Sequence, residues 1–398
     1  MKNRTAARFS GIEKSATFAV VDTVRALRAQ GVHVLDLGSG EPSFDTSAHI
    51  TAEASKALLG GFTHYTPSRG LPELLEAIAG KLARDNAVVV DPATDIIVTP
   101  SAKHALYISM MSVLDPGDEV IIPTPSWVSY QSMARLAGAR PVAARLSAQD
   151  GFRLSRALLE RYVTERTKAL LINTPNNPTG RALTRQEAFE VAEFAAEHDL
   201  LVITDEIYEK VLYGAEHLSL ASLPAAAGRT LVVNGFSKGY AMTGWRLGYV
   251  AGPGDVIGEM VKVQEHSVGC AGSFVQRGGL AALTGAQDFI REMVDEYAVR
   301  REVIVAGLNA LPGVSCELPE GALYAFPDIS ATGLGTSAQF AAWLLEEAGV
   351  AVTPGSAFGP GGEGHVRLSF ATSRDVIEAA LERMATALAG RRGAAVRG

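Results

Sequence analysis

The sequence places a lysine and an aspartate directly after two short apolar runs. Lys238 follows closely on residues 230–234, and Asp205 follows residues 200–204. A lysine amine whose pKa is lowered by burial is a candidate nucleophile. A carboxylate at the end of an apolar strand is largely buried and needs a cation opposite it, because an unpaired buried charge is costly. Taken singly, each residue also has an ordinary explanation, a solvated loop lysine and a helix N-cap acid.

Two further runs end in groups that bind anions or donate hydrogen bonds. Ser101, Ala102 and Lys103 open a predicted helix and offer a hydroxyl, free backbone N–H groups and a cation. Asn177 lies in the proline-rich turn after residues 168–173. A plain serine N-cap and a plain turn are the alternatives. Taken together, the four ends match what an aldehyde cofactor with a phosphate and a pyridine nitrogen requires.

A parallel sheet must position these residues. From residue 95 to about residue 250, short β-branched runs alternate with helical patterns, which predicts parallel strands covered by helices. Ligands bind beyond the carboxyl ends of such strands, so the four ends should meet at one site. The predicted strands are 95–99, 119–123, 168–173, 200–204, 230–234 and 246–250, and the predicted helices are 105–114, 127–137 and 184–198.

The two ends of the chain predict a smaller α+β unit. We expect residues 1–45 and 286–398 to form this unit and residues 46–285 to form the larger domain. The tail from residue 390 is rich in glycine and arginine and is expected to be disordered. The predicted elements of the smaller unit are helices at 18–30, 288–311, 337–348 and 374–388 and strands near 32–37, 322–326 and 365–370.

Composition excludes several classes of protein. The 398 residues include 36 Lys plus Arg against 43 Asp plus Glu, a net charge of −7, so a nucleic-acid partner is not expected. No run of about 20 apolar residues predicts a membrane span, and the first residues lack the apolar core of a signal peptide. The two cysteines are far apart in sequence and form no metal or disulfide pattern. We therefore expect a cytoplasmic protein without a membrane partner.

Seven motifs, in order along the chain, resemble the class I aminotransferases, a family of fold-type I pyridoxal 5′-phosphate (PLP) enzymes. The similarity is greatest to the bacterial aspartate aminotransferase-like branch. It implies an α/β fold with a large domain around a mostly parallel sheet of the seven-stranded type and a small α+β domain. The motifs are GSGEPSFDT at Gly38, THYTPSRG at Thr63, PTPSWVSY at Pro123, NTPNNPTG at Asn173, TDEIYE at Thr204, SKGYAMTGWRLGY at Ser237 and GHVRLSFATS at Gly364.

The resemblance implies roles for residues around the cofactor ring. Lys238 would form the internal aldimine with PLP and then shuttle a proton between the substrate and the cofactor. Asp205 would face the pyridine nitrogen and keep it protonated. Tyr208 and Asn177 would hydrogen-bond the phenolic oxygen of the ring, and Trp127 would stack on the ring.

The resemblance also implies a phosphate site and a partner subunit. Ser101, the backbone N–H of Ala102 and the side chain of Arg246 would hold the phosphate, with Lys103 adding charge. Tyr65 resembles the tyrosine that reaches the phosphate from the neighbouring subunit. A homodimer with shared active sites is therefore expected.

For the substrate, the resemblance implies that Arg367 binds the α-carboxylate through a bidentate pair. The backbone N–H of Gly40 would help, and Trp127 and Asn177 would line the same site. An acidic substrate needs a second cation for its distal carboxylate. The sequence does not single one out among candidates such as Lys14 and Arg277.

Two positions depart from the family pattern. Gly235 stands where relatives often have a phosphate-binding serine, so that contact is either missing or supplied by Ser237 or Lys103. Ala102 stands where a glycine is frequent, which bears on how tightly that turn closes. Residues 264–283 differ most from the family and are interpreted either as shaping the side-chain pocket or as a loop and a small-residue helix at a dimer interface.

The activity implied is that of an amino acid transaminase. It would move an amino group from an L-amino acid to a 2-oxo acid through pyridoxamine phosphate, with aspartate, glutamate and 2-oxoglutarate or a broader set as substrates. A PLP-dependent lyase, cyclase or oxidase of the same fold is the alternative. Those reactions share the carbanionic intermediate and differ mainly in the shape of the pocket.

Overall fold

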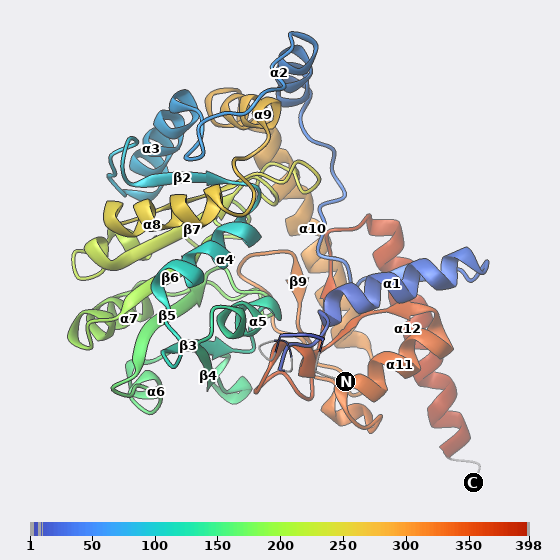
Figure 1. The fold of residues 1–398 in the computed structure, drawn as a ribbon. Helices are drawn as coiled ribbons and strands as arrows, with labels where there is room; N and C mark the ends of the chain where they lie inside the picture. The colour runs from blue at the N-terminus through green and yellow to red at the C-terminus, as the bar shows by residue number, and fades with distance from the viewer. Residues whose placement is uncertain (1–3, 7–8, 10, 396–398) are drawn as a thin grey trace.

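The computed structural model describes residues 4–6, 9 and 11–395, without the side chains of 392–395. Its described residues form a central sheet of seven strands (Figure 1). All neighbouring strands run parallel except β8, which is antiparallel to both of its neighbours. In spatial order the strands are β2 (Ile96–Thr99), β8 (Gly248–Ala251), β7 (Thr230–Gly235), β6 (Leu201–Asp205), β5 (Thr167–Asn173), β3 (Glu119–Thr124) and β4 (Arg140–Arg145).

Both faces of this sheet are covered by helices, so its strands are apolar on both sides. In β5, for example, Leu171 packs on one face with α4, α5 and α8, and Leu170 packs on the other face with α7. Helices α3 and α9 cover that second face beside β2 and β8. The helices of this part are α2 (Ala48–Leu59), α3 (Pro72–Asn86), α4 (Ala102–Val113), α5 (Ser129–Leu136), α6 (Arg156–Leu159), α7 (Arg185–Glu197), α8 (Gly254–Glu265) and α9 (Ser273–Thr284).

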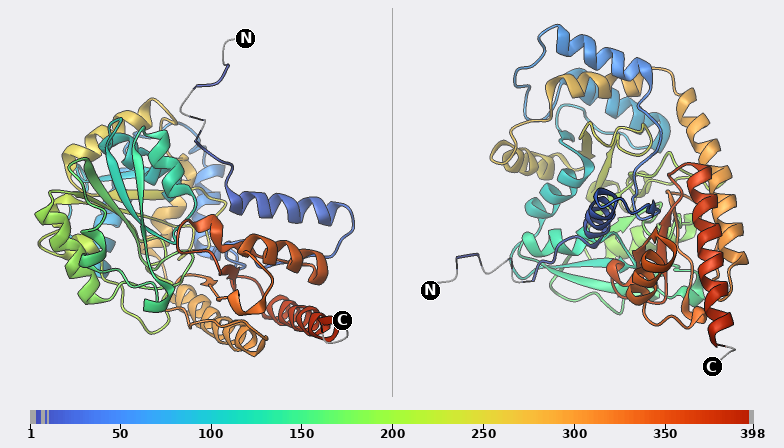
Figure 2. Two further views of the ribbon diagram at one scale, coloured as in Figure 1. Left: turned by 90° about the horizontal axis from the view of Figure 1, so that it is seen from below. Right: turned by 90° about the vertical axis from the view of Figure 1, so that its right-hand side faces the viewer.

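A smaller α+β unit is built from segments near both ends of the chain, as Figure 2 shows from two further sides. The pairing of Leu35 with Val350 ties a strand near the N-terminus to the C-terminal part. The antiparallel strands β11, β12 and β9 form a second small sheet. The elements are α1 (Ala16–Ala29), β1 (Leu35–Asp36), α10 (Asp288–Ala310), β9 (Tyr324–Ala325), α11 (Ser337–Ala348), β10 (Val350–Ala351), β11 (Thr353–Pro354), β12 (Val366–Ser369) and α12 (Arg374–Ala395).

The six strands predicted for the central block are all present, and the mostly parallel seven-stranded sheet is confirmed. The seventh strand, β4, was not predicted, because its sequence RPVAAR holds few β-branched residues and it lies at the sheet edge, half exposed. The domain limits at residues 45/46 and 285/286 stay a prediction. Among the described residues, no helix is both long and apolar enough to cross a membrane.

The last helix differs from the expectation. A helix was predicted over 374–388 with a disordered tail, but α12 continues to Ala395. Alanine and arginine are good helix formers and carry the helix on past Gly390. The prediction of disorder is therefore wrong for residues 390–395, and residues 396–398 lie outside the described part of the chain.

Candidate active site

A cavity of about 500 Å³ lies where β5, β6 and β7 end, roofed in part by side chains of α1. This is the edge of the sheet at which the predicted chemical groups were expected to meet. Every predicted site residue except Tyr65 lines the cavity. These residues are Gly40, Ser101, Ala102, Lys103, Trp127, Asn177, Asp205, Tyr208, Lys238, Arg246 and Arg367.

Lys238 lies three residues beyond the end of β7, on the wall of the cavity. Its Nζ donates a hydrogen bond of 2.6 Å to the carbonyl oxygen of Gly40. Burial lowers the pKa of the Lys238 amine, and the charges of Arg367 and Arg246 lower it further. A larger share of this amine is therefore neutral, and so nucleophilic, than in an exposed lysine.

Asp205 ends β6 with its carboxylate buried beside the cavity. Burial raises the pKa of Asp205 to about 6, although hydrogen bonds from Tyr130 and the backbone N–H of Ile207 oppose that shift. The Tyr130 hydroxyl donates to Oδ2 of Asp205 at 2.7 Å. The carboxylate thus has neutral donors nearby and gains most from a cationic partner.

Sequence reasoning did not assign Tyr130 a role, although the residue lies in the motif PTPSWVSY. Tyr130 follows Trp127 by one helical turn at the start of α5, and the two rings meet edge to face with centroids 5.3 Å apart. The sequence could have indicated Tyr130 only through Asp205, because a buried carboxylate needs hydrogen-bond donors from the ends of nearby strands.

Tyr324 is a second site residue that the sequence did not single out. Its hydroxyl lies 2.8 Å from the hydroxyl of Tyr208. A Cβ placed on Gly40 would overlap the Tyr324 hydroxyl, so only glycine lets the chain pass here. Only its place beside another site residue could have indicated Tyr324, because it pairs with Ser369 on β12, the strand that carries Arg367.

Arg367 is 2% exposed, and not all of its guanidinium nitrogens are hydrogen-bonded within the described residues. Its Nη1 donates to Oδ1 of Asn177 at 3.0 Å and its Nη2 to the carbonyl oxygen of Gly38 at 2.7 Å. Its Nε has no hydrogen-bond partner among those residues, and the guanidinium lies 4.3 Å from the Tyr324 ring centroid. A buried guanidinium with a free donor is suited to a carboxylate.

The start of α4 forms the opposite wall of the cavity. The Ser101 side chain accepts a hydrogen bond from the backbone N–H of His104, and Ser101 has a φ of 101°, unusual for a residue with a side chain. A Cβ on Gly248 would overlap the backbone of Ser101 and Ala102. The turn is therefore tight even with alanine at position 102.

The departure at Gly235 has a steric reason. A Cβ there would lie 2.9 Å from the Leu247 carbonyl oxygen and 3.0 Å from Cα of Gly248, so a serine does not fit without a backbone shift. Ser237 lies two residues further on and does line the cavity.

The charges around the cavity are unbalanced. Among the described residues that line it, the basic side chains are Lys103, Lys238, Arg246 and Arg367, and the acidic ones are Glu41 and Asp205. An excess of positive charge next to a helix N-terminus attracts phosphate and carboxylate groups. The residues present therefore fit a phosphorylated aldehyde cofactor together with a substrate carboxylate.

Comparison with known proteins agrees with this geometry. The family model of aminotransferase class I and II matches residues 32–384. The chain belongs to this aminotransferase family. The aspartate aminotransferase of Musicola paradisiaca is 48% identical over 382 residues, which cover 96% of each chain.

Solved structures resemble this aminotransferase along nearly its whole length. An aspartate aminotransferase from Thermus thermophilus with maleate superimposes with a TM-score of 0.93 at 41% identity, over 97% of this chain and 100% of that one. An aromatic aminotransferase from Pyrococcus horikoshii gives 0.88 at 46% identity, over 92% and 99%. The expected fold-type I architecture is confirmed, and the aminotransferase is a PLP-dependent amino acid transaminase rather than a lyase, cyclase or oxidase.

Three residues that the sequence offered as cations or as a partner contact do not line the cavity of this aminotransferase. Tyr65 is 95% exposed and does not line the cavity. Arg277 pairs with Glu73 at 3.3 Å and lies over the Phe62 ring, while Lys14 is exposed. Neither Arg277 nor Lys14 is among the residues that line this chain's own cavity.

Proposed function

We propose that this transaminase takes acidic substrates, moving the amino group between aspartate or glutamate and 2-oxo acids such as 2-oxoglutarate. The observation that carries the proposal is the excess of positive charge in the cavity, where Arg367 and Lys103 lie in addition to Lys238 and Arg246. The aspartate aminotransferases among the relatives support it, as does the relative solved with maleate, which is a dicarboxylate.

Lys103 is the cation that we assign to the distal carboxylate. Its Nζ lies 4.8 Å from the centroid of the Phe18 ring and 4.9 Å from that of Trp127, which hold the side chain on the cavity wall. Burial lowers the pKa of Lys103, and the charges of Arg246 and Lys238 lower it further. A bound dicarboxylate would relieve this repulsion between cations.

The cofactor roles of the remaining residues are also part of the proposal. Bound PLP supplies an electron sink for the bond that is broken at the substrate α-carbon. Lys238 would hold the cofactor covalently, and Asp205 would pair with its ring nitrogen. Asn177 and Tyr208 would bind its ring oxygen, and Trp127 would stack on its ring.

The phosphate would lie against the start of α4. Ser101 would donate its hydroxyl, Ala102 its backbone N–H group and Arg246 its guanidinium. The steric crowding around Gly248 sets how closely this backbone approaches the sheet, and the site therefore needs no glycine at position 102.

Lys238 would carry the proton during transfer. Burial lowers the pKa of its amine, so the group can accept a proton from the substrate α-carbon and return it. The carbonyl of Gly40 accepts a hydrogen bond from the amine and orients it. The same glycine presents its backbone N–H to the substrate in this proposal.

The substitution Arg367→Ala should raise KM for the amino acid and for the 2-oxo acid by about 10- to 100-fold, since a hydrogen-bonded charged pair contributes about 1.5–3 kcal/mol. Steady-state kinetics would measure this. Arg367→Lys should recover only part of the loss, because lysine lacks the planar fork. An unchanged KM in Arg367→Ala would move the carboxylate site elsewhere.

The substitution Lys103→Met should raise KM for aspartate and glutamate by about 10-fold and leave KM for an aromatic amino acid nearly unchanged. Lys262→Met is the matched control, because Lys262 lies exposed on α8 with Glu259. Equal effects of Lys103→Met on acidic and aromatic substrates would contradict the role of Lys103 in side-chain recognition.

The experiment that tests the function is a spectral screen of single amino acids with the PLP-loaded enzyme and no 2-oxo acid. Bleaching of the cofactor absorbance should be fastest with aspartate or glutamate. Bleaching by aromatic amino acids alone would reject the acidic substrate. Absence of bleaching with all common amino acids would count against the transaminase reaction itself.

We also propose a homodimer. Leu59 and Tyr65 are 88% and 95% exposed, an unusual exposure for large apolar side chains so close in sequence. A second copy covering this region would bring Tyr65 to the partner's phosphate site, the role that the family resemblance implies.

The substitution Tyr65→Ser tests the shared site. It should weaken PLP binding by about 10-fold, the loss expected for one hydrogen bond to a charged group, with the dimer seen by sedimentation retained. Val89→Ser is the matched control, because Val89 is 89% exposed elsewhere on the surface. A monomer at micromolar concentration would contradict the proposal.

A cytoplasmic location is part of the same proposal. Cys270 and Cys316 are both free thiols, which suits a reducing compartment.

A further inference from the structure

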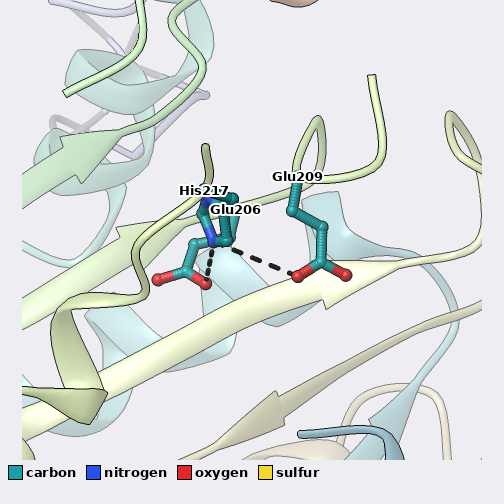
Figure 3. Close-up of side chains that lie close together, drawn as sticks. All are labelled: Glu206, Glu209 and His217. Carbon is teal, nitrogen blue, oxygen red and sulfur yellow. Dashed lines mark hydrogen bonds and ion pairs between the residues drawn. The ribbon is translucent and has the colours of Figure 1, made fainter. Parts of the chain in front are cut away.

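A cluster of buried charges lies behind the end of β6, on the side away from the cavity. It consists of Glu206, Glu209 and His217, which face one another in Figure 3. Nε2 of His217 lies 2.8 Å from Oε2 of Glu206 and 4.0 Å from Oε2 of Glu209. Glu206 is fully buried, and the side chains of the other two are 7% and 10% exposed. None of the three lines the active-site cavity.

The buried charges of the cluster have nearby partners. Glu206 accepts hydrogen bonds from the hydroxyls of Thr204 at 3.2 Å and Ser219 at 2.9 Å. Glu209 forms an ion pair with Lys81. Two carboxylates thus meet one ammonium and one imidazole, and although the three residue types could hold a metal ion, Lys81 already provides a cation there.

His217 is more basic than an ordinary histidine. Burial lowers its pKa, but the charge of Glu206, the hydrogen bond to Glu206 and the charge of Glu209 outweigh burial and raise the pKa overall. Conversely, Lys81 and His217 outweigh the burial of Glu209 and lower its pKa to about 2. The pairing therefore favours a cationic imidazole between two carboxylates.

This cluster brackets the turn that carries two proposed cofactor residues. Glu206 directly follows Asp205, and Glu209 directly follows Tyr208. The backbone N–H of Glu206 donates to the Val233 carbonyl on β7, and the N–H of Glu209 donates back to the Glu206 carbonyl, both at 2.9 Å. The charge pairs therefore hold the turn from its far side.

The cluster also acts electrostatically on the acid in the cavity. The negative charge of Glu206 raises the pKa of Asp205, adding to the larger effect of burial. A positive charge paired with Glu206 cancels part of that field at short range. Losing the imidazole charge would therefore leave Asp205 next to an uncompensated carboxylate.

We propose that His217 is a positioning residue of the transaminase site, whose positive charge compensates Glu206 so that Asp205 keeps its own charge beside the cofactor ring. This inference rests on the proposed role of Asp205. His217 does not touch the cavity and acts through Glu206, across the end of β6.

Other charged and titratable groups face Asp205, Glu209 and His217 from the neighbouring elements. Tyr130 on α5 and Lys238 after β7 face Asp205. Lys81 on α3 faces His217 and Glu209. Tyr240, and Tyr249 on β8, also face Glu209, but burial raises the pKa of both phenols above its ordinary value, so they stay neutral near pH 7.

The test measures how much PLP the loaded enzyme retains after gel filtration at a series of acidic pH values. Loss of the negative charge on Asp205 should weaken PLP binding. The pH at which half of the PLP is lost, the midpoint, therefore reports the ionisation of Asp205. His217→Gln keeps a hydrogen-bond donor but no charge, and it should move the midpoint up by about one pH unit. Glu206→Gln should move the midpoint down, and the double variant should return it close to the wild-type value.

The matched control is His198→Gln. His198 pairs with Glu160 at 3.2 Å and does not line the cavity, so its loss should leave the midpoint unchanged. Shifts of opposite sign in the two single variants cannot come from general loosening of the fold, which thermal unfolding would reveal separately. Shifts of the same sign, or a double variant as displaced as His217→Gln, would overturn the compensation by His217.

The variant Asp205→Asn separates this inference from the function on which it rests. When His217→Gln is added to Asp205→Asn, the midpoint should no longer shift. If Asp205→Asn itself leaves PLP retention and its pH dependence unchanged, the proposed role of Asp205 fails. If Asp205→Asn alters retention while His217→Gln alone does not shift the midpoint, only the role of His217 fails.

Discussion

Replacing Lys238 by alanine should abolish transamination, lowering kcat by about 10⁴-fold, the upper range for a positioned proton-transfer group. Among the residues that the structure describes, no other amine lies in the same position. Lys103 also lines the cavity, but its ammonium is held against the rings of Phe18 and Trp127 rather than at the Gly40 carbonyl. It cannot replace an amine that must reach the substrate α-carbon.

Two measurements check this prediction. Single-turnover mixing with aspartate separates the chemical step from substrate binding, and the absorbance of the protein with PLP shows whether cofactor is still held by the other contacts. Lys262→Ala is the matched control, because Lys262 lies exposed on α8 with Glu259. Turnover within tenfold of the wild-type value in Lys238→Ala would remove Lys238 from its role.

Asp205→Asn should lower kcat by about 10²- to 10³-fold while retaining some cofactor. Breaking a buried ion pair costs about 3–5 kcal/mol, and the amide cannot keep a ring nitrogen protonated. The Tyr130 hydroxyl can still donate to the amide oxygen, so the geometry of the pocket should persist. Near-normal turnover would contradict the pairing of Asp205 with the ring nitrogen.

The same substitution should stabilise the enzyme once PLP has been removed. In the folded protein, burial raises the pKa of Asp205 from 3.8 to about 6, so between these pH values the folded state holds a proton that the unfolded state releases. Stability therefore falls as pH rises through this window and levels off above it. Asp205→Asn lifts this penalty, by up to about 3 kcal/mol at pH 7.

Denaturant unfolding of the PLP-free protein at pH 4 and pH 7 would measure the effect. The variant should gain stability over the wild type at pH 7 and little at pH 4. An equal effect at both pH values would show that the buried charge is not its source. Destabilisation of the empty protein by the proposed cofactor-binding acid would be the stability cost expected of a preorganised site.

The sequence predicted which residues meet in the cavity better than it predicted the contacts that support them. Lys238 and Asp205 could be found because each follows an apolar strand, and parallel strands bring their ends together. The contact between Tyr130 and Asp205 joins residues 75 positions apart, and that between Tyr208 and Tyr324 joins residues 116 apart. Such distances depend on the packing of complete elements, which no local pattern contains.

The substrate end of the pocket shows the same limit. Lys103 was expected to add charge at the phosphate, because its neighbours in sequence form that site. That role stays a prediction, but the Lys103 side chain also contacts Phe18 on α1, which the sequence did not indicate. The direction of a long side chain is set by tertiary neighbours, so its partner could not be inferred from position alone.

The pairing of β1 with β10 has a consequence for biosynthesis. Arg367 binds the Gly38 carbonyl across 329 positions of sequence, and Leu35 pairs with Val350. On the ribosome, the cofactor-binding strands β2 to β8 emerge long before Arg367 is synthesised. A nascent chain arrested after β8 would lack Arg367, the proposed carboxylate-binding residue, so by this proposal the enzyme can act on an amino acid only after translation has passed β12.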